Sequence, residues 1–129
     1  MWIYAQGTGE LYWEHPPVRE LVGTGYAGAG SLKNDPDRQC VSDLGPIPRG
    51  DYTIGPIGDH GPGGVLKSAL PLTPDAGNDM CSPPRSNFLI HGDSVQAPGW
   101  ASAGCIIMAL DIRKKINQSG DNRLRVVQG

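Results

Sequence analysis

Residues 88–94 of the chain read Phe-Leu-Ile-His-Gly-Asp-Ser, and residues 98–107 read Pro-Gly-Trp-Ala-Ser-Ala-Gly-Cys-Ile-Ile. Residues 88–90 and 105–107 are apolar at consecutive positions. Such short runs are typical of strands that are buried on both faces. Asp93 to Gly99, between them, is rich in turn-forming residues and predicts a loop. We therefore expect two buried strands with this loop between them.

Further strand signals lie on either side of this stretch and are separated by glycine and proline. Trp2–Tyr4 and Leu11–Trp13 flank Gly7-Thr8-Gly9 and predict a hairpin. Gly55 to Gly64 predicts a surface loop. The other candidate strands are residues 20–27, 51–54, 65–73, with a break at Pro71, and 124–127.

The sequence contains one convincing helix signal, near the C-terminus. Met108, Ile112 and Ile116 recur at helical spacing, with residues 113–115 (Arg-Lys-Lys) expected on the opposite face. Gly120 is placed to end the helix. With 19 glycines and 12 prolines among 129 residues, the chain cannot be a helix bundle. We predict one domain, residues 1–129, that is mainly β with this single short helix.

Charge and hydropathy exclude several function classes. Eleven basic and thirteen acidic residues leave a net charge of −2, which gives no footprint for nucleic acid. The longest apolar run, Cys105 to Leu110, is far too short to span a membrane, so no membrane insertion is expected. The N-terminus lacks the pattern of a secretory signal peptide, so we expect another route of export. No ligand pair has metal-site spacing, and neither a metal nor a cofactor is expected.

His91 and Cys105 are the residues best suited to covalent chemistry. A cysteine attacks a carbonyl as its thiolate, and a histidine within reach can take the thiol proton and later protonate the leaving amine. Three small residues, Ser102 to Gly104, open the approach to the sulfur. We expect backbone N–H groups of Gly104 and Cys105 to stabilise an oxyanion. The alternative is that both residues belong only to the core.

The chain has three cysteines, so at least one has no intramolecular partner. We expect Cys105 to be the only catalytic one, as an exposed thiol of low pKa. Cys40 and Cys81 could form a disulfide in an oxidising compartment or remain as two buried thiols. The sequence alone leaves both possibilities open.

His-Gly followed by Ser-x-Gly-Cys resembles the signature of the YkuD-like L,D-transpeptidase catalytic domain. Residues 47–54 (Ile-Pro-Arg-Gly-Asp-Tyr-Thr-Ile) are similar to an upstream segment of such domains. Together with residues 25–28, 33–36, 45–48 and 91–94, these blocks resemble the small L,D-transpeptidase-like effectors of type VI secretion systems. The resemblance runs from about Trp2 to Ile116, nearly the whole chain.

This resemblance implies an antiparallel β-sandwich or barrel that attacks peptidoglycan stem peptides. It implies His91 as the base and Cys105 as the nucleophile of an L,D-carboxypeptidase that removes terminal D-alanine and can exchange it for another D-amino acid. It also implies a cognate immunity protein, contact with secretion machinery, and delivery from the cytoplasm to the periplasm of target bacteria. Ala103 departs from the family pattern, because cross-linking enzymes usually carry His or Arg there.

Five further residues are candidates for substrate binding. Arg85 could hold a substrate carboxylate or be a solvated surface residue. Trp100 could line the groove or cover the core, and Ser102 could bind substrate or turn the backbone. Gly92 would let a substrate approach, and Asp93 or the following serine could orient the histidine, as a backbone carbonyl also could. Two rival functions are a non-catalytic peptidoglycan-binding module and a housekeeping cross-linking transpeptidase.

Overall fold

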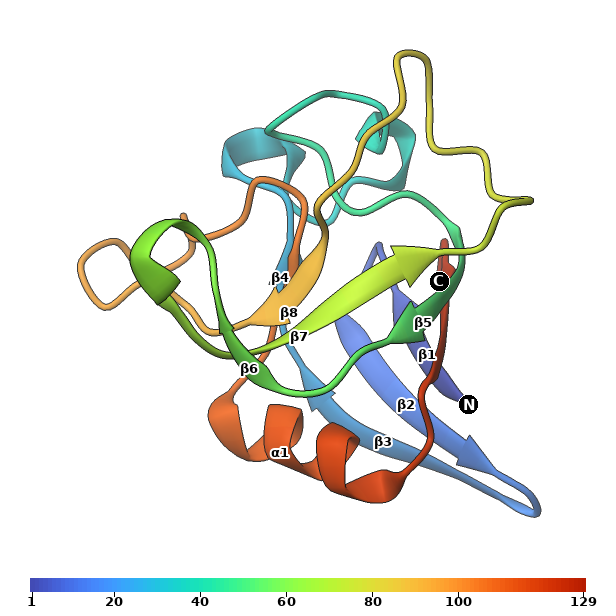
Figure 1. Ribbon diagram of the computed structural model, residues 1–129. Helices are drawn as coiled ribbons and strands as arrows, with labels where there is room; N and C mark the ends of the chain where they lie inside the picture. Colours follow the sequence, from blue (N-terminus) through green and yellow to red (C-terminus); the bar gives the residue numbers. More distant parts are fainter.

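The computed structural model describes residues 1–129 and contains ten strands and one α-helix (Figure 1). The strands are β1 (Trp2–Ala5), β2 (Glu10–His15), β3 (Val18–Thr24), β4 (Tyr26–Ala27), β5 (Gly50–Ile54), β6 (Gly58–His60), β7 (Leu66–Pro74), β8 (Leu89–His91), β9 (Ile106–Ile107) and β10 (Arg123–Val127), and the helix is α1 (Leu110–Ser119). Three short 3-10 helices cover Gly30–Leu32, Pro36–Arg38 and Pro62–Gly64. The predicted mainly β fold with one short helix near the C-terminus is confirmed.

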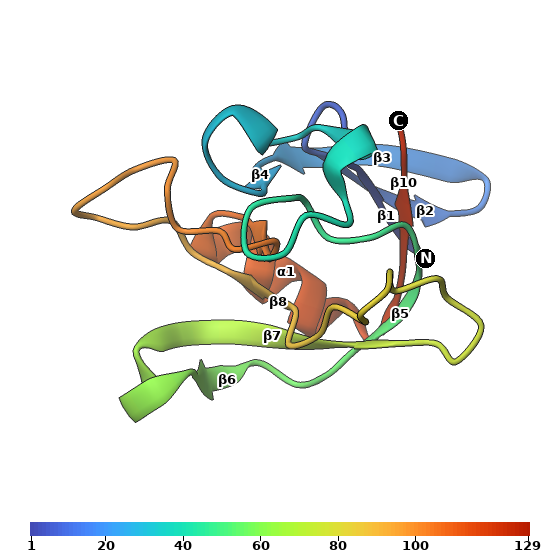
Figure 2. The ribbon, with the colours of Figure 1, turned by 90° about the horizontal axis from the view of Figure 1, so that it is seen from above.

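All ten strands belong to one strongly curved sheet. Nine follow the order β3-β2-β1-β10-β5-β7-β8-β9-β4, and β6 pairs with the edge of β7. The two ends of this path, β3 and β4, are separated in the chain by Gly25 alone. Figure 2 shows β1 to β3 on one side of the molecule and β6 and β7 on the other. Gly25 is required at this crossing, because a Cβ there would lie 1.7 Å from the Ile107 carbonyl oxygen.

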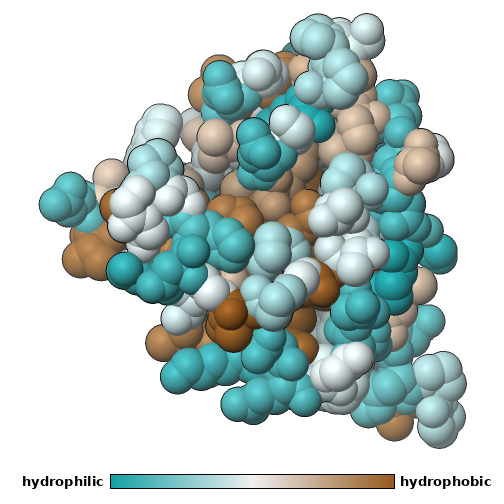
Figure 3. All heavy atoms as spheres, in the orientation of Figure 1, coloured by the Kyte–Doolittle hydropathy of each residue, from teal (hydrophilic) through white to brown (hydrophobic).

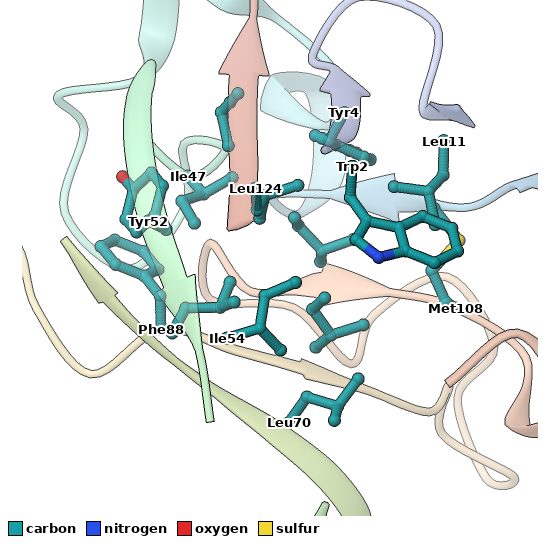
Figure 4. Packing of buried hydrophobic residues seen from close by; sticks show 14 of the residues in the cluster. Trp2, Tyr4, Leu11, Ile47, Tyr52, Ile54, Leu70, Phe88, Met108 and Leu124 are labelled. Atoms are coloured by element: carbon teal, nitrogen blue, oxygen red, sulfur yellow. The ribbon is translucent and has the colours of Figure 1, made fainter. Parts of the chain in front are cut away.

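The curved sheet encloses a core of 16 buried residues (Figure 4). The cluster includes Trp2 and Tyr4 of β1, Leu70 of β7 and Ile90 of β8, and each of the four is completely buried. Burial of one such large apolar side chain contributes about 1.5–3 kcal/mol. The short strands thus depend on packing across the core for their stability.

Two strand pairings correct the expectation of a wholly antiparallel sheet. The first strand, β1, pairs with the last, β10, in parallel, with Trp2 opposite Leu124. The β8–β9 pair is also parallel, with Ile90 opposite Ile106. Parallel neighbours need a long connection, which the chain supplies here by the 14-residue crossover between His91 and Ile106. The sheet is therefore mixed.

The predicted hairpin of residues 2–13 is confirmed as β1 and β2, and the closing strand as β10. The loop predicted for residues 55–64 was wrong in part, because β6 pairs with β7 there. The predicted break at Pro71 is also wrong. Pro71 lies inside β7 and contributes only its carbonyl oxygen, which accepts a hydrogen bond from Gly55 N–H.

The helix begins two residues after Met108 and ends, as expected, at Gly120, which has the left-handed conformation. Arg113 does not lie on the exposed face predicted for it but is buried. It precedes Ile116 by three positions, so both residues share the inward face. No helix of the chain has the length and apolar character needed to cross a membrane.

Candidate active site

The parallel β8–β9 pair brings Cys105 and His91 onto the same face of the sheet. His91 is the last residue of β8, opposite Ile107, and Cys105 immediately precedes β9. Ile90 and Ile106 point into the core cluster. Because side chains alternate along a strand, His91 and Cys105 lie on the opposite face, one diagonal step apart. Their neighbourhood, which the sequence predicted from two separate motifs, follows from this register.

The His91 ring is buried and makes one hydrogen bond, between Nδ1 and the Gly92 carbonyl oxygen at 2.9 Å. In the neutral imidazole, Nδ1–H donates to this carbonyl and Nε2 keeps its lone pair. A backbone carbonyl therefore orients the ring, as one of the predicted alternatives stated. Burial lowers the pKa of His91, and the positive charge of Arg113 acts in the same direction. The resting histidine is a neutral base.

The Cys105 sulfur rests against the backbone of the segment that leads into β8. It accepts a hydrogen bond from Leu89 N–H at 3.3 Å, and its S–H faces the Asn87 carbonyl oxygen at 3.9 Å. Burial raises the pKa of Cys105, although the Leu89 N–H and the Arg85 charge act in the opposite direction. The expectation of an exposed thiol of low pKa is thus corrected: the thiol is half-buried, and burial raises its pKa. Its activation requires a base.

Ser102 fixes the turn before the cysteine. Its buried hydroxyl oxygen accepts hydrogen bonds from Gly28 N–H and Gly104 N–H, and the hydroxyl donates to the Cys105 carbonyl at 2.6 Å. These contacts favour the backbone-turning alternative over substrate binding. They also engage Gly104 N–H, which therefore differs from the free oxyanion donor expected at this position.

Arg85 is a buried clamp and not a solvated surface residue. Its Nη1 donates to the carbonyls of Gln39 and Pro46, and its Nη2 donates to those of Gly45 and Ala103. All four terminal N–H groups are therefore used by the protein itself. Arg85 therefore has a structural role beside Cys105 and does not have donors left to bind a substrate carboxylate.

A disulfide joins the same two segments that Arg85 connects. Cys40 and Cys81 are bonded, with their Cα atoms 5.4 Å apart, which decides between the two alternatives that the sequence left open. The segments lie together at the top of Figure 1. Cys105 is consequently the only free thiol of the chain.

The loop after β8 is organised by Asp93. Its carboxylate accepts hydrogen bonds from the Tyr26 hydroxyl at 2.6 Å and from the N–H groups of Ser94 and Gly99. Burial and the bond to Asp93 raise the pKa of Tyr26 to about 12. Trp100 in the same loop is 65% exposed and lines a hollow with His91, which favours the groove-lining alternative.

Two hollows lie on the outer face of β7 and β8. One, of about 590 Å³, is lined by His91, Asp93, Trp100 and Arg113 among others. The other, of about 680 Å³, is lined by Asn87 and Leu89, the backbone contacts of Cys105, and shares Leu66 with the first. Figure 3, which faces these strands, shows apolar atoms exposed between hydrophilic groups. An extended ligand crossing both hollows would pass His91 and the two backbone contacts of Cys105.

Comparison with known families identifies the chain. The family model of the Tlde1 domain matches residues 22–128, most of the chain and all of the site described above. The chain belongs to the Tlde1 domain family. No curated protein matches it.

The Tlde1 domain is found in type VI secretion effectors, as the sequence resemblance indicated. Membership of this effector family fits delivery of the protein into target cells. It also implies two general kinds of partner, the secretion machinery and an immunity protein.

Arg113 of this Tlde1 domain lies near the site, although the sequence pattern predicted it on the exposed face of the helix. It lines the same hollow as His91, and its Nη2 atom would lie 2.8 Å from a Cβ on Gly92. Gly92 therefore admits the Arg113 guanidinium and not only a substrate. The helical spacing from Ile116 was the available signal, and the charge of the side chain obscured it.

Proposed function

We propose that this Tlde1 domain is a cysteine-dependent L,D-carboxypeptidase that removes the terminal D-alanine from tetrapeptide stems of peptidoglycan and exchanges it for other D-amino acids. One observation supports the proposal: in the β8–β9 register Cys105, the single free thiol, and His91 lie on one face of the sheet, and His91 lines one of the two hollows. The family resemblance of the surrounding motifs supports the substrate class.

Acylation begins when the Cys105 sulfur attacks the carbonyl carbon of the third stem residue. His91 Nε2 takes the thiol proton as the carbon–sulfur bond forms. The carbon–nitrogen bond to D-alanine then breaks, and the same proton passes from Nε2 to the departing amine. Burial lowers the pKa of His91 and raises the pKa of Cys105, so it favours the neutral form of both groups, and we assign the transfer of the thiol proton to the attack itself.

The oxygen of the tetrahedral intermediate carries a negative charge, which hydrogen-bond donors must stabilise. Gly104 N–H is already bonded to Ser102, so we assign the role to Cys105 N–H. The Arg85 charge favours the Cys105 thiolate and would favour an adjacent oxyanion in the same way. Arg85 thus contributes as a fixed charge and not as a substrate ligand.

Deacylation completes the cycle. Water, deprotonated by His91, adds to the thioester and releases a tripeptide carboxylate and the Cys105 thiol. A free D-amino acid can add through its amine instead, which forms a new amide and exchanges the terminal residue. Water needs no groove and a D-amino acid needs only a small pocket, so we expect hydrolysis and exchange to exceed cross-linking of two stems.

The test is incubation of the protein with purified tetrapeptide muropeptides, alone and with excess D-methionine, followed by mass spectrometry. Tripeptide should dominate the first reaction, and tetrapeptide ending in D-methionine should appear in the second. Cys105→Ala and His91→Ala should abolish both products, and Lys114→Gln, an exposed change on α1, should abolish neither. Cross-linked dimers as the main product would favour a housekeeping transpeptidase. Binding without turnover would favour a non-catalytic module.

In this proposal the domain acts in the periplasm of the target cell. Stem peptides are its substrate there, and a cognate immunity protein protects the producer and its kin.

A further inference from the structure

Arg113 is a buried cation with one unused end. Only 7% of the residue is exposed. Its Nε donates to the Met108 carbonyl oxygen, and its Nη1 donates to the carbonyls of Lys67 and Ser68. Its Nη2 has no hydrogen-bond partner within the protein, and this atom is not fully buried. The residual exposure of Arg113 thus includes a free, fixed donor beside Gly92.

No acidic side chain of the protein neutralises this cation. Arg113 forms no salt bridge, and the carboxylate of Asp93, which lines the same hollow, is occupied by Tyr26 and two backbone N–H groups. The other cation of this hollow, Lys67, is largely exposed and paired with Asp59. An unpaired buried charge is costly, and an anionic ligand would compensate for it.

We propose that Arg113 binds the C-terminal carboxylate of the stem peptide and so selects substrates whose leaving residue is a free amino acid. This inference rests on the proposed function. His91 protonates the amine of the leaving residue, and the carboxylate is attached to the same carbon as that amine. His91 and Arg113 line one hollow, and Gly92 adjoins both residues, so we expect a single amino acid to reach both.

The same contact sets the acceptor in exchange. Exchange reverses acylation, so the incoming amine occupies the position that the leaving amine vacated, and its carboxylate meets Arg113. Free D-amino acids should therefore be acceptors, whereas D-amino acid amides should not. The three carbonyl bonds on Nε and Nη1 hold the guanidinium rigid, so little side-chain entropy is lost when the carboxylate binds.

The experiment compares a tetrapeptide stem with the same stem carrying a C-terminal carboxamide. For the wild type we expect kcat/KM to fall by roughly 10- to 100-fold on amidation, which is the size of a charge-assisted hydrogen bond to a partly desolvated carboxylate. In Arg113→Gln the two substrates should react equally, at the rate of the amide. Lys114→Gln, on the same helix, and Lys67→Gln, in the same hollow, should keep the wild-type preference.

Two further measurements guard against a variant that merely fails to fold. Gly92→Ala removes none of the carbonyl groups that hold Arg113 but crowds Nη2, and it should reduce the preference for the acid. In Cys105→Ala, which cannot react, the tetrapeptide acid should bind more tightly than its amide by calorimetry. Equal turnover of acid and amide by the wild type, or loss of the preference in Lys67→Gln alone, would overturn the inference. Absence of turnover on either substrate would instead reject the proposed function.

Discussion

Removal of the Cys40–Cys81 disulfide should destabilise the domain by about 4 kcal/mol. The bond closes a loop with a sequence separation of 41, and the chain-entropy relation for a loop of this length gives about 4 kcal/mol at 25 °C. The closed loop includes β5, β6 and β7, so much of the central sheet is formed within it. Because a domain of this size has only about 5–15 kcal/mol of stability, the loss is a large share of it.

The variant to measure is Cys40→Ser/Cys81→Ser in a Cys105→Ala background, because the third thiol is then absent and cannot mispair. The control is Cys105→Ala alone, unfolded in urea under the same conditions. With an m-value of about 1–3 kcal/mol/M, the urea midpoint should fall by roughly 1.3–4 M. A loss below about 1 kcal/mol would refute the reasoning. It would mean that the Arg85 clamp already holds the two segments together without the covalent bond.

Three further outcomes are expected. The acid limb of the pH profile of kcat/KM should have its midpoint below the ordinary pKa of histidine. Burial and the charge of Arg113 lower the pKa of His91, and activity is lost when the pH falls through that pKa. A midpoint above pH 7 would contradict this. Iodoacetamide should label Cys105 alone in the oxidised protein, and slowly below pH 8 because burial raises its pKa; peptide mapping at several pH values checks both points. Gly104→Ala should lower the free energy of unfolding by more than about 2 kcal/mol, as measured by thermal unfolding. A Cβ there would lie 2.5 Å from Arg85 Nη2, and the backbone φ of Gly104 is +126°. A smaller loss of stability would show that Arg85 can move.

The local elements of the fold could be predicted from the sequence, whereas their long-range pairing could not. Trp2–Tyr4 and Leu11–Trp13 form a hairpin because the turn that connects them is local. The parallel contact between Trp2 and Leu124 joins opposite ends of the chain, and no local pattern encodes it. The strand β6 was missed because its residues, Gly-Asp-His, have no strand propensity and form a strand only by pairing with β7.

The sequence indicated the His91–Cys105 pair of the candidate site but not the contacts that surround it. His91 and Cys105 carry chemistry that few other residues can supply, so their type and motif point to them. Ser102 and Arg85 act through backbone atoms contributed by distant segments, and the sequence does not record where those carbonyls and N–H groups lie. The state of the thiol was mispredicted for the same reason, since it depends on burial.

The two buried arginines beside the site illustrate how hydrogen-bond saturation separates a structural role from a binding role. Arg85 and Arg113 are buried to nearly the same extent, 9% and 7% exposed, and both donate to backbone carbonyls. Both terminal nitrogens of Arg85 donate all their hydrogen bonds to backbone carbonyls. A substrate anion could therefore bind Arg85 only by displacing a carbonyl, which would be left without a hydrogen bond. Arg113 keeps Nη2 free and would lose nothing on binding an anion. Arg85, for which the sequence left substrate binding and a surface position open, therefore has no donor left for a substrate, whereas Arg113, which the sequence assigned to the exposed face, has one.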